Sequence, residues 1–118
     1  MERDMDLIRE LLLQVDSNPK LDGTHYHIFN KPIEGHSLQE VTYHVDLLFE
    51  AGYVKGTSTS DLPMVTGLTW EGHEFLDHIR DSGVWASIKQ RIKGLPGVSI
   101  ALLGELGKAE LMKRLHMR

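Results

Sequence analysis

The stretch that most constrains the fold is "SLQEVTYHVDLLFEAGYV", which occupies residues 37–54. Ser37 and Glu40 form an S-x-x-E capping box, in which each side chain satisfies a free backbone amide at the start of a helix. Gly52 provides the left-handed residue with which helices commonly end, so the chain should become extended at Tyr53. The apolar residues in between recur at helical spacing and predict one buried stripe: Leu38, Val41, Val45 and Leu48.

A β-hairpin and another helix are predicted after this segment. "KGTSTSDLPM" at 55–64 has the polarity of a hairpin loop, and "VTGL" at 65–68 has the character of a returning strand. Thr69 fits a helix N-cap, and "DSG" at 81–83 ends that helix. Its inward face is predicted to contain a glycine, which permits close approach of a neighbouring element, and three large residues: Gly72, Phe75, Leu76 and Ile79.

A helix and a short strand are predicted before the capping box. Asp4 fits an N-cap, and "DSNP" at 16–19 ends the helix because Asn18 before a proline is pushed towards extended angles. The strand is predicted within "THYHIF" at 24–29. The order helix, strand, helix, hairpin, helix predicts an α+β fold of the winged-helix class. The apolar stripe of the first helix is Met5, Ile8, Leu12 and Val15, widened by Leu11.

Two additional helices are predicted in the C-terminal third. "VWASIKQRIK" at 84–93 and residues 98–115 have helical spacing, and "GLPG" at 94–97 separates them. We therefore expect a winged-helix-like domain at 1–83 and a basic helical extension at 84–118, packed on that domain or used for dimerisation. One side of the last helix contains Leu102, Leu106, Ala109 and Met112.

Two glycines inside the last predicted helix need a structural reason. Gly104 and Gly107 each cost ~1 kcal/mol relative to alanine in a helix interior. They are tolerated where another helix packs closely or where the helix itself bends, and homodimerisation through residues 98–115 is one way to bring another helix near.

Charge is distributed unevenly along the chain. Residues 1–83 contain 6 Lys/Arg and 15 Asp/Glu, whereas residues 84–118 contain 7 and 2. Electrostatics therefore favours the C-terminal third for contact with a polyanion, unless this basic tail docks on the acidic body of its own chain. The predicted basic surface consists of Lys89, Arg91, Lys93, Lys113 and Arg114.

Composition excludes several classes of protein. A length of 118 residues is one domain's worth of sequence, and the absence of cysteine excludes disulfides and thiolate–zinc sites. No apolar run approaches the ~20 residues of a membrane span, and the acidic start "MERDMD" is not a signal peptide. We expect a soluble, cytoplasmic protein.

The histidines do not form a recognisable metal or catalytic site. A zinc-protease helix needs H-E-x-x-H, whereas His73 and His78 are five residues apart and point roughly 140° away from each other on a helix. Ion pairs at i, i+4 spacing, His73 with Asp77 or Glu74 with His78, explain the stretch better. His25 and His27 share one strand face but have no third ligand. Because no G-x-S-x-G elbow, P-loop or dinucleotide motif occurs, we expect a non-enzymatic protein without metal or cofactor.

Nucleic-acid binding is the sharpest functional hypothesis. In a winged helix, the helix before the hairpin enters the major groove and its outward residues read base edges. Residues 37–52, however, contain Glu40, Asp46 and Glu50 and no lysine or arginine, and such a helix repels phosphates. The candidate contacts to DNA or to a partner protein are Gln39, Thr42, Tyr43 and Asp46 on the helix and Lys55 and Thr57 on the wing.

Three segments resemble one known family. "RDMDLIRELL", "IEGHSLQEVTYHVDLLFEAGYV" and "LTWEGHEFLDHIRDSGVW" are similar to the bacterial and prophage family labelled domain of unknown function 2513. More loosely, "VTYHVDLLFEAGYV" resembles the recognition helix of ArsR-type regulators, and "LT-x-x-G" from Leu68 resembles the post-wing helix of MarR-type repressors. The resemblance implies a winged-helix fold in bacteria or their mobile elements and implies no reaction. The chain departs from these regulators because the segment before Ser37 has no separate helix.

Three functional hypotheses follow. The favoured one is transcription-regulator-like binding of duplex DNA. The second is a protein-interaction module, such as a phage-encoded modulator of a host protein. Homodimerisation through the last helix is compatible with either.

Overall fold

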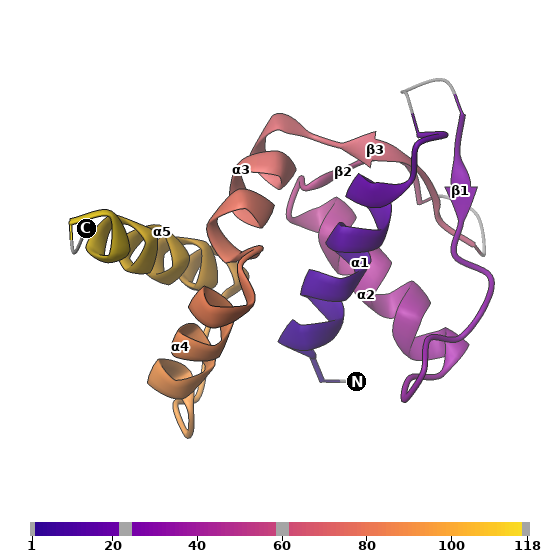
Figure 1. Cartoon of the computed structure of the whole chain (residues 1–118). Coiled ribbons are helices and arrows are strands. Elements are labelled where there is room, and N and C mark those ends of the chain that lie inside the picture. The colour runs from indigo at the N-terminus through magenta and orange to yellow at the C-terminus, as the bar shows by residue number, and fades with distance from the viewer. Residues whose placement is uncertain (1, 22–24, 59–61, 117–118) are drawn as a thin grey trace. The chain divides into compact units, whose positions relative to one another are not determined.

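The structure is a computed structural model that describes residues 2–21, 25–58 and 62–116 (Figure 1). Within these residues the fold is α+β, with five helices and one three-stranded antiparallel sheet. The chain divides into two compact units, Met1–His73 and Glu74–Arg118. This division lies inside the helix that follows the hairpin, whereas the sequence-based boundary lies at 83/84. Among the described residues, no helix is both long enough and apolar enough to cross a membrane.

The first unit contains the element order that the sequence predicts. Helix α1 (Met5–Ser17) is followed by strand β1 (His27–Ile28), helix α2 (Leu38–Glu50) and the hairpin strands β2 (Val54–Thr57) and β3 (Met64–Leu68). The sheet order is β1-β3-β2, so the short first strand pairs with the returning strand of the hairpin. The start of helix α3 (Trp70–Ile79) completes the unit (Figure 1).

Helix α1 begins and ends where the sequence predicts. The Asp4 side chain accepts a hydrogen bond from the Leu7 amide at 3.2 Å, and Asn18 is the extended C-cap. One detail of the predicted stripe is wrong: Met5 is partly exposed, and Leu7 is buried in its place. The buried face of α1 consists of Leu7, Ile8, Leu11, Leu12 and Val15.

Helix α2 has the predicted capping box. The Ser37 hydroxyl accepts a hydrogen bond from the Glu40 amide at 3.1 Å, and the Glu40 carboxylate accepts one from the Ser37 amide at 3.4 Å. Gly52 ends the helix at φ +76°, the left-handed conformation that glycine favours. The buried residues are Val41, His44, Val45 and Leu48, so the stripe contains a histidine that the prediction left out. Leu38, which the prediction placed in the stripe, is partly exposed.

The hairpin contains a bulge on its first strand. The pairing shifts between Lys55 and Gly56, and Gly56 has a φ of +137°. A Cβ atom at this glycine would overlap the carbonyl oxygen of Met64 on the paired strand. The tip of the predicted loop, residues 59–61, lies outside the described residues.

A compact junction joins α2, the hairpin and α3. The Thr69 hydroxyl donates a hydrogen bond to the Gly52 carbonyl at 2.5 Å and accepts one from the Gly72 amide at 2.9 Å, which makes it the predicted N-cap. The Thr69 amide donates to the Tyr53 carbonyl at 3.1 Å. Gly72 lies against the same carbonyl so closely that a Cβ atom would overlap it, as the close approach predicted for this glycine requires.

The second unit is a helical assembly of the end of α3 with α4 (Ser82–Ile92) and α5 (Ile100–His116). Asp81 has a different role from the predicted one, because its side chain caps α4 by accepting a hydrogen bond from the Val84 amide at 2.9 Å. Ser82 and Gly83 lie inside α4 and do not end α3. The buried apolar residues of this unit are Phe75, Leu76, Ile79, Val84, Trp85, Ile88, Ile100 and Leu103.

The two glycines of α5 face α3 of the same chain. A Cβ atom at Gly104 would lie 3.0 Å from the ring of Phe75, and one at Gly107 would overlap the carbonyl oxygen of His78. The close helix contact predicted for these glycines is therefore confirmed. It is made within the chain, so the glycines are not free to bring two copies together.

The Gly56 bulge generates a stability prediction. Gly56→Ala should lower the free energy of unfolding by more than about 2 kcal/mol, because the new methyl group meets a backbone carbonyl at a φ that alanine disfavours. Gly52→Ala is the matched control, since its Cβ would meet nothing within 4 Å and only the positive φ remains, at about 1 kcal/mol. Urea unfolding followed by circular dichroism measures both, and equal losses would contradict the overlap at Gly56.

Candidate partner-binding surface on helix α2

The predicted contact residues of α2 lie on the side of the helix away from its buried stripe. Gln39 and Asp46 are exposed, whereas Thr42 and Tyr43 are partly buried. The Thr42 hydroxyl donates a hydrogen bond to the Gln39 carbonyl at 3.1 Å, so it is engaged within the helix. We use "the α2 surface" for five residues: Gln39, Thr42, Tyr43, Asp46 and Glu50.

The predicted wing contacts lie on β2. Lys55 and Thr57 are exposed, and Thr57 is paired with Met64 of β3. They belong to the strand that follows α2 directly, so both sets of predicted residues lie in the same unit.

The α2 surface is acidic. Asp46 and Glu50 are four residues apart, and the pKa of Asp46 is raised above its ordinary value by partial burial and by the nearby charge of Glu50. The first unit contains 5 Lys/Arg and 12 Asp/Glu, so the surface belongs to a strongly acidic body. Carboxylates that repel each other on a surface favour a cationic partner.

An exposed tryptophan lies at the start of α3. Trp70 is 73% exposed and follows Thr69, whose hydroxyl is bonded to Gly52 at the end of α2. Tryptophan is enriched at the centres of protein interfaces, where it contributes much of the binding energy. Trp70 is not among the residues predicted from the sequence, because the apolar pattern alone does not tell an exposed helix start from a buried one.

A buried histidine connects α2 to α1. His44 is 1% exposed, its Nδ1 donates a hydrogen bond to the Glu40 carbonyl at 2.7 Å, and its Nε2 accepts one from the Asp4 amide at 2.7 Å. A backbone amide can only donate, so Nε2 must be unprotonated and the ring neutral. His44 therefore has a structural role. The sequence could have predicted that His44 is buried, because it lies three residues after Val41 and next to Val45 of the predicted stripe.

A second histidine lies between two carboxylates at the same helix ends. His36 Nδ1 is 3.1 Å from Glu40 and its Nε2 is 3.8 Å from Asp4. The hydrogen bond with His36, followed by that from the Ser37 amide, lowers the pKa of Glu40 below its ordinary value. Glu40 thus has local partners, unlike the repelling pair of Asp46 and Glu50.

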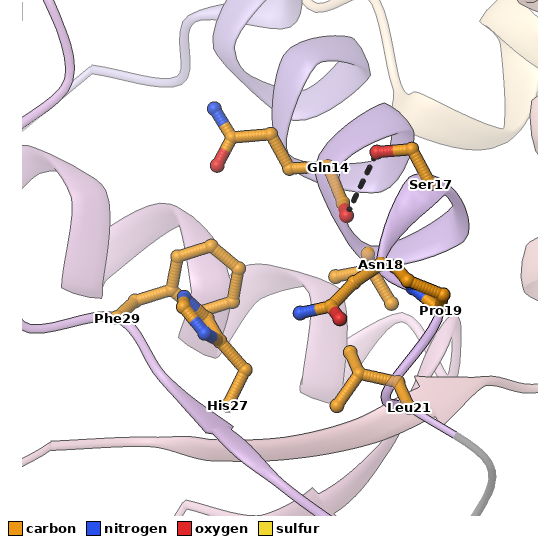
Figure 2. A pocket seen from close by; sticks show the side chains of 8 residues that line it. Gln14, Ser17, Asn18, Pro19, Leu21, His27 and Phe29 are labelled. Atoms are coloured by element: carbon orange, nitrogen blue, oxygen red, sulfur yellow. Dashed lines mark hydrogen bonds between the residues drawn. The ribbon is translucent and has the colours of Figure 1, made fainter.

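A cavity of about 270 Å³ lies between the end of α1 and β1 (Figure 2). Figure 2 shows the hydrogen bond that the Ser17 hydroxyl donates to the Gln14 carbonyl. The Asn18 side chain also accepts a hydrogen bond, from the Lys20 amide. The His27 ring packs edge-on against Phe29, with ring centroids 4.6 Å apart. The cavity is lined by Gln14, Val15, Ser17, Asn18, Pro19, Leu21, His27 and Phe29. Several of its polar groups are already paired, and no charged side chain points to a reaction there.

The histidines singled out in the sequence are separate from one another. His73 lies 3.8 Å from Asp16 of α1, so the predicted pairing along its own helix is replaced by a contact across the unit. Asp77 pairs with Arg80 at 3.6 Å. Within residues 2–21, 25–58 and 62–116, no group of three potential metal ligands occurs, and the pair His25 and His27 has no third member.

Two residues of the predicted basic surface form ion pairs within the chain. Arg91 and Arg114 contact the buried carboxylate of Glu110 at 3.5 and 3.4 Å, and Arg114 also lies 3.8 Å from Asp81. The pairing arises because a carboxylate in a helix interface requires cationic partners. Two of the five predicted residues are therefore engaged in ion pairs within the second unit, although all five side chains are exposed.

Comparison with known proteins identifies relatives. The family model described as "Hypothetical protein (DUF2513)" matches residues 2–99, which confirms the resemblance of the three quoted segments. An uncharacterized protein of Haemophilus influenzae is 36% identical over 97 residues, covering 79% of this chain and 80% of the relative. No solved structure matches. The matched region includes the α2 surface and ends before α5.

Replacing His44 should destabilise the first unit. His44→Ala leaves the Asp4 amide without its acceptor and opens a cavity, so the free energy of unfolding should fall by about 2–4 kcal/mol. The neighbouring Thr42→Ala, which removes a hydroxyl that donates to the Gln39 carbonyl of the same helix, should change it by less than about 1 kcal/mol. Urea unfolding at neutral pH measures both variants, and similar small losses would show that the α1–α2 hydrogen bond contributes little.

Two acids of α2 should respond oppositely to neutralisation. The folded-state pKa of Glu40 is lowered, so its charge stabilises the fold above the carboxylate range, and Glu40→Gln should reduce stability at neutral pH. The folded-state pKa of Asp46 is raised, so its charge destabilises the fold there, and Asp46→Asn should increase stability by less than about 1 kcal/mol.

Both differences should disappear as the pH falls from about 5 to about 3, where the wild-type carboxylates become protonated. Thermal unfolding of the wild type and the two variants across this range measures them. Differences of the same sign, or differences that persist at the lowest pH, would contradict the assigned electrostatics.

Proposed function

This chain belongs to the family described as "Hypothetical protein (DUF2513)", and from that premise we propose that it acts by binding rather than catalysis. In this proposal the first unit is a winged-helix-like module. The α2 surface and Trp70 contact a partner protein, and the partner presents a basic surface.

The winged-helix assignment is supported by the connectivity of the first unit. The helix α2 directly precedes the β2–β3 hairpin, and β1 pairs with β3 at the other edge. In winged-helix proteins, the helix before the hairpin is the one that enters a partner's groove. The α2 surface occupies the corresponding position.

The observation that carries the choice of partner is the charge of this surface. Residues 37–52 contain three acids and no lysine or arginine, and the unit as a whole has seven more acids than bases. Phosphate neutralisation supplies most of the non-specific affinity of DNA-binding proteins, so this charge opposes DNA at the recognition helix. The same charge steers a basic protein towards the surface and raises its association rate. Trp70 adds the exposed aromatic area that such an interface uses.

Duplex DNA is the second candidate. It is favoured by the helix–hairpin order, with Gln39, Thr42 and Tyr43 as base readers and Lys55 and Thr57 on the wing. Residues 29–37 form only turns and an isolated bridge between Ile33 and His36, so the first helix of a helix-turn-helix is missing. That helix normally crosses the phosphate backbone, and its absence removes part of the usual DNA contact.

The test is affinity capture from a bacterial lysate with charge-reversed variants. The wild-type chain should retain a specific protein that the double variant Asp46→Lys with Glu50→Lys loses and that Trp70→Ala retains less well. The control, Glu2→Lys with Glu34→Lys, makes the same charge change at exposed positions outside the α2 surface and should retain the partner.

Binding to a duplex oligonucleotide decides between the candidates. Fluorescence anisotropy at about 50 and about 200 mM salt should show no salt-dependent association with DNA. Association that weakens with added salt and in the Tyr43→Ala variant would indicate that the α2 surface binds duplex DNA rather than a protein. Capture that is indifferent to both double variants would contradict any role for this surface.

A further inference from the structure

One face of α5 is fully used inside the second unit. Gly104 and Gly107 lie against Phe75 and His78 of α3. Glu110, on the same face, is held by Arg91 and Arg114. This face therefore has no capacity for another contact.

The opposite face of α5 is exposed and contains large apolar side chains. Leu102 and Met112 are 42% and 50% exposed, and Leu115 beside them is 61% exposed. Ala109 is exposed between Leu102 and Met112, and Leu106 is partly buried at the edge. Exposed apolar side chains that are grouped on one face of a helix are typical of an interaction surface.

Charges on the exposed face determine which partner fits. Glu105 lies four residues before Ala109 and Lys113 lies four residues after it, and both side chains are exposed. Each is about 6 Å from Ala109 along the helix axis. The face is thus negative on one side of a small residue and positive, at the same distance, on the other.

We propose that two copies of this chain pair through this face, with their α5 helices antiparallel and Ala109 at the two-fold axis. In that arrangement Glu105 of one copy lies opposite Lys113 of the other, and the symmetry repeats the pair. Leu106 lies opposite Met112, three residues on either side of the axis. The small alanine lets the two helices approach closely at their crossing.

A parallel pair of α5 helices is disfavoured by the same two charged residues. It places Glu105 opposite Glu105 and Lys113 opposite Lys113, which turns two attractive contacts into two repulsive ones. Like charges across helix pairs select orientation in this way in coiled coils.

The pairing is weak and depends on concentration. A contact made by one helix from each copy is small beside the roughly 1,200 Å² of stable interfaces, so we expect a transient dimer. The proposal does not depend on the function of the α2 surface, because α5 lies in the other unit and after the region that the family model matches.

Charge reversal tests the register. In sedimentation equilibrium up to about 1 mM, the wild type should dimerise, and Glu105→Lys or Lys113→Glu alone should weaken dimerisation about tenfold. The double reversal restores opposite charges and should return the affinity to within about threefold of the wild type. Lys93→Glu, an exposed lysine outside α5, is the control and should leave dimerisation unchanged.

Cysteine crosslinking tests the orientation independently, since the chain has no cysteine. Under mild oxidation Ala109→Cys should form a disulfide-linked dimer, because the two positions meet at the axis. Leu102→Cys should not, because its two copies lie about 20 Å apart along antiparallel helices. Crosslinking of both variants would indicate a parallel pair, and a wild-type monomer at all concentrations would overturn the proposal. Circular dichroism confirms that each variant is folded.

Discussion

The first unit depends on the junction between the end of α2 and the start of α3. Thr69 satisfies the Gly52 carbonyl and the Gly72 amide with one hydroxyl, and Gly72 lets the backbone of α3 touch that of Tyr53. The segment between these two points contains the hairpin, so its base is closed on both sides. The junction thereby holds the hairpin next to α2 and brings Trp70 to the end of that helix. A larger residue at position 72 has no space, which is why the sequence needs glycine within a helix there.

Two histidines, His36 and His44, make different contacts in the N-terminal half of α2. His44 is hydrogen-bonded to the backbone groups of Asp4 and Glu40, whereas His36 lies between the carboxylates of the same two residues. These contacts use the inner and N-terminal parts of α2. The side that remains contains Asp46, whose pKa is raised by partial burial and by the nearby charge of Glu50. A carboxylate whose folded-state pKa is raised makes the fold slightly less stable at neutral pH, where the group is ionised.

In the second unit two of the basic side chains are held in ion pairs, whereas the net charge of the segment is unchanged. The buried side chain of Glu110 forms ion pairs with Arg91 and Arg114. The tail is therefore less available to a polyanion than its composition indicates. Close packing of the α5 glycines on α3 also decides which side of α5 faces outward. That side contains most of the apolar stripe found in the sequence, Leu102, Ala109 and Met112.

The sequence by itself determined the order of the elements and most of their ends. The capping box at Ser37, the positive φ of Gly52 and the apolar periods of α1 and α2 act within a few residues, so they can be read locally. Only the tertiary structure decided what joins distant residues. His44 meets Asp4 across 40 positions, and Arg91 meets Glu110 across 19. The apolar period predicts a stripe on α5 but not whether that stripe faces the core or the solvent. The packing of Gly104 and Gly107 on α3 decides this, and it leaves most of the stripe exposed. The same holds for the candidate site. Its residues on α2 follow from the helical repeat, whereas the position of Trp70 near the end of α2 follows from a hydrogen bond between Thr69 and Gly52.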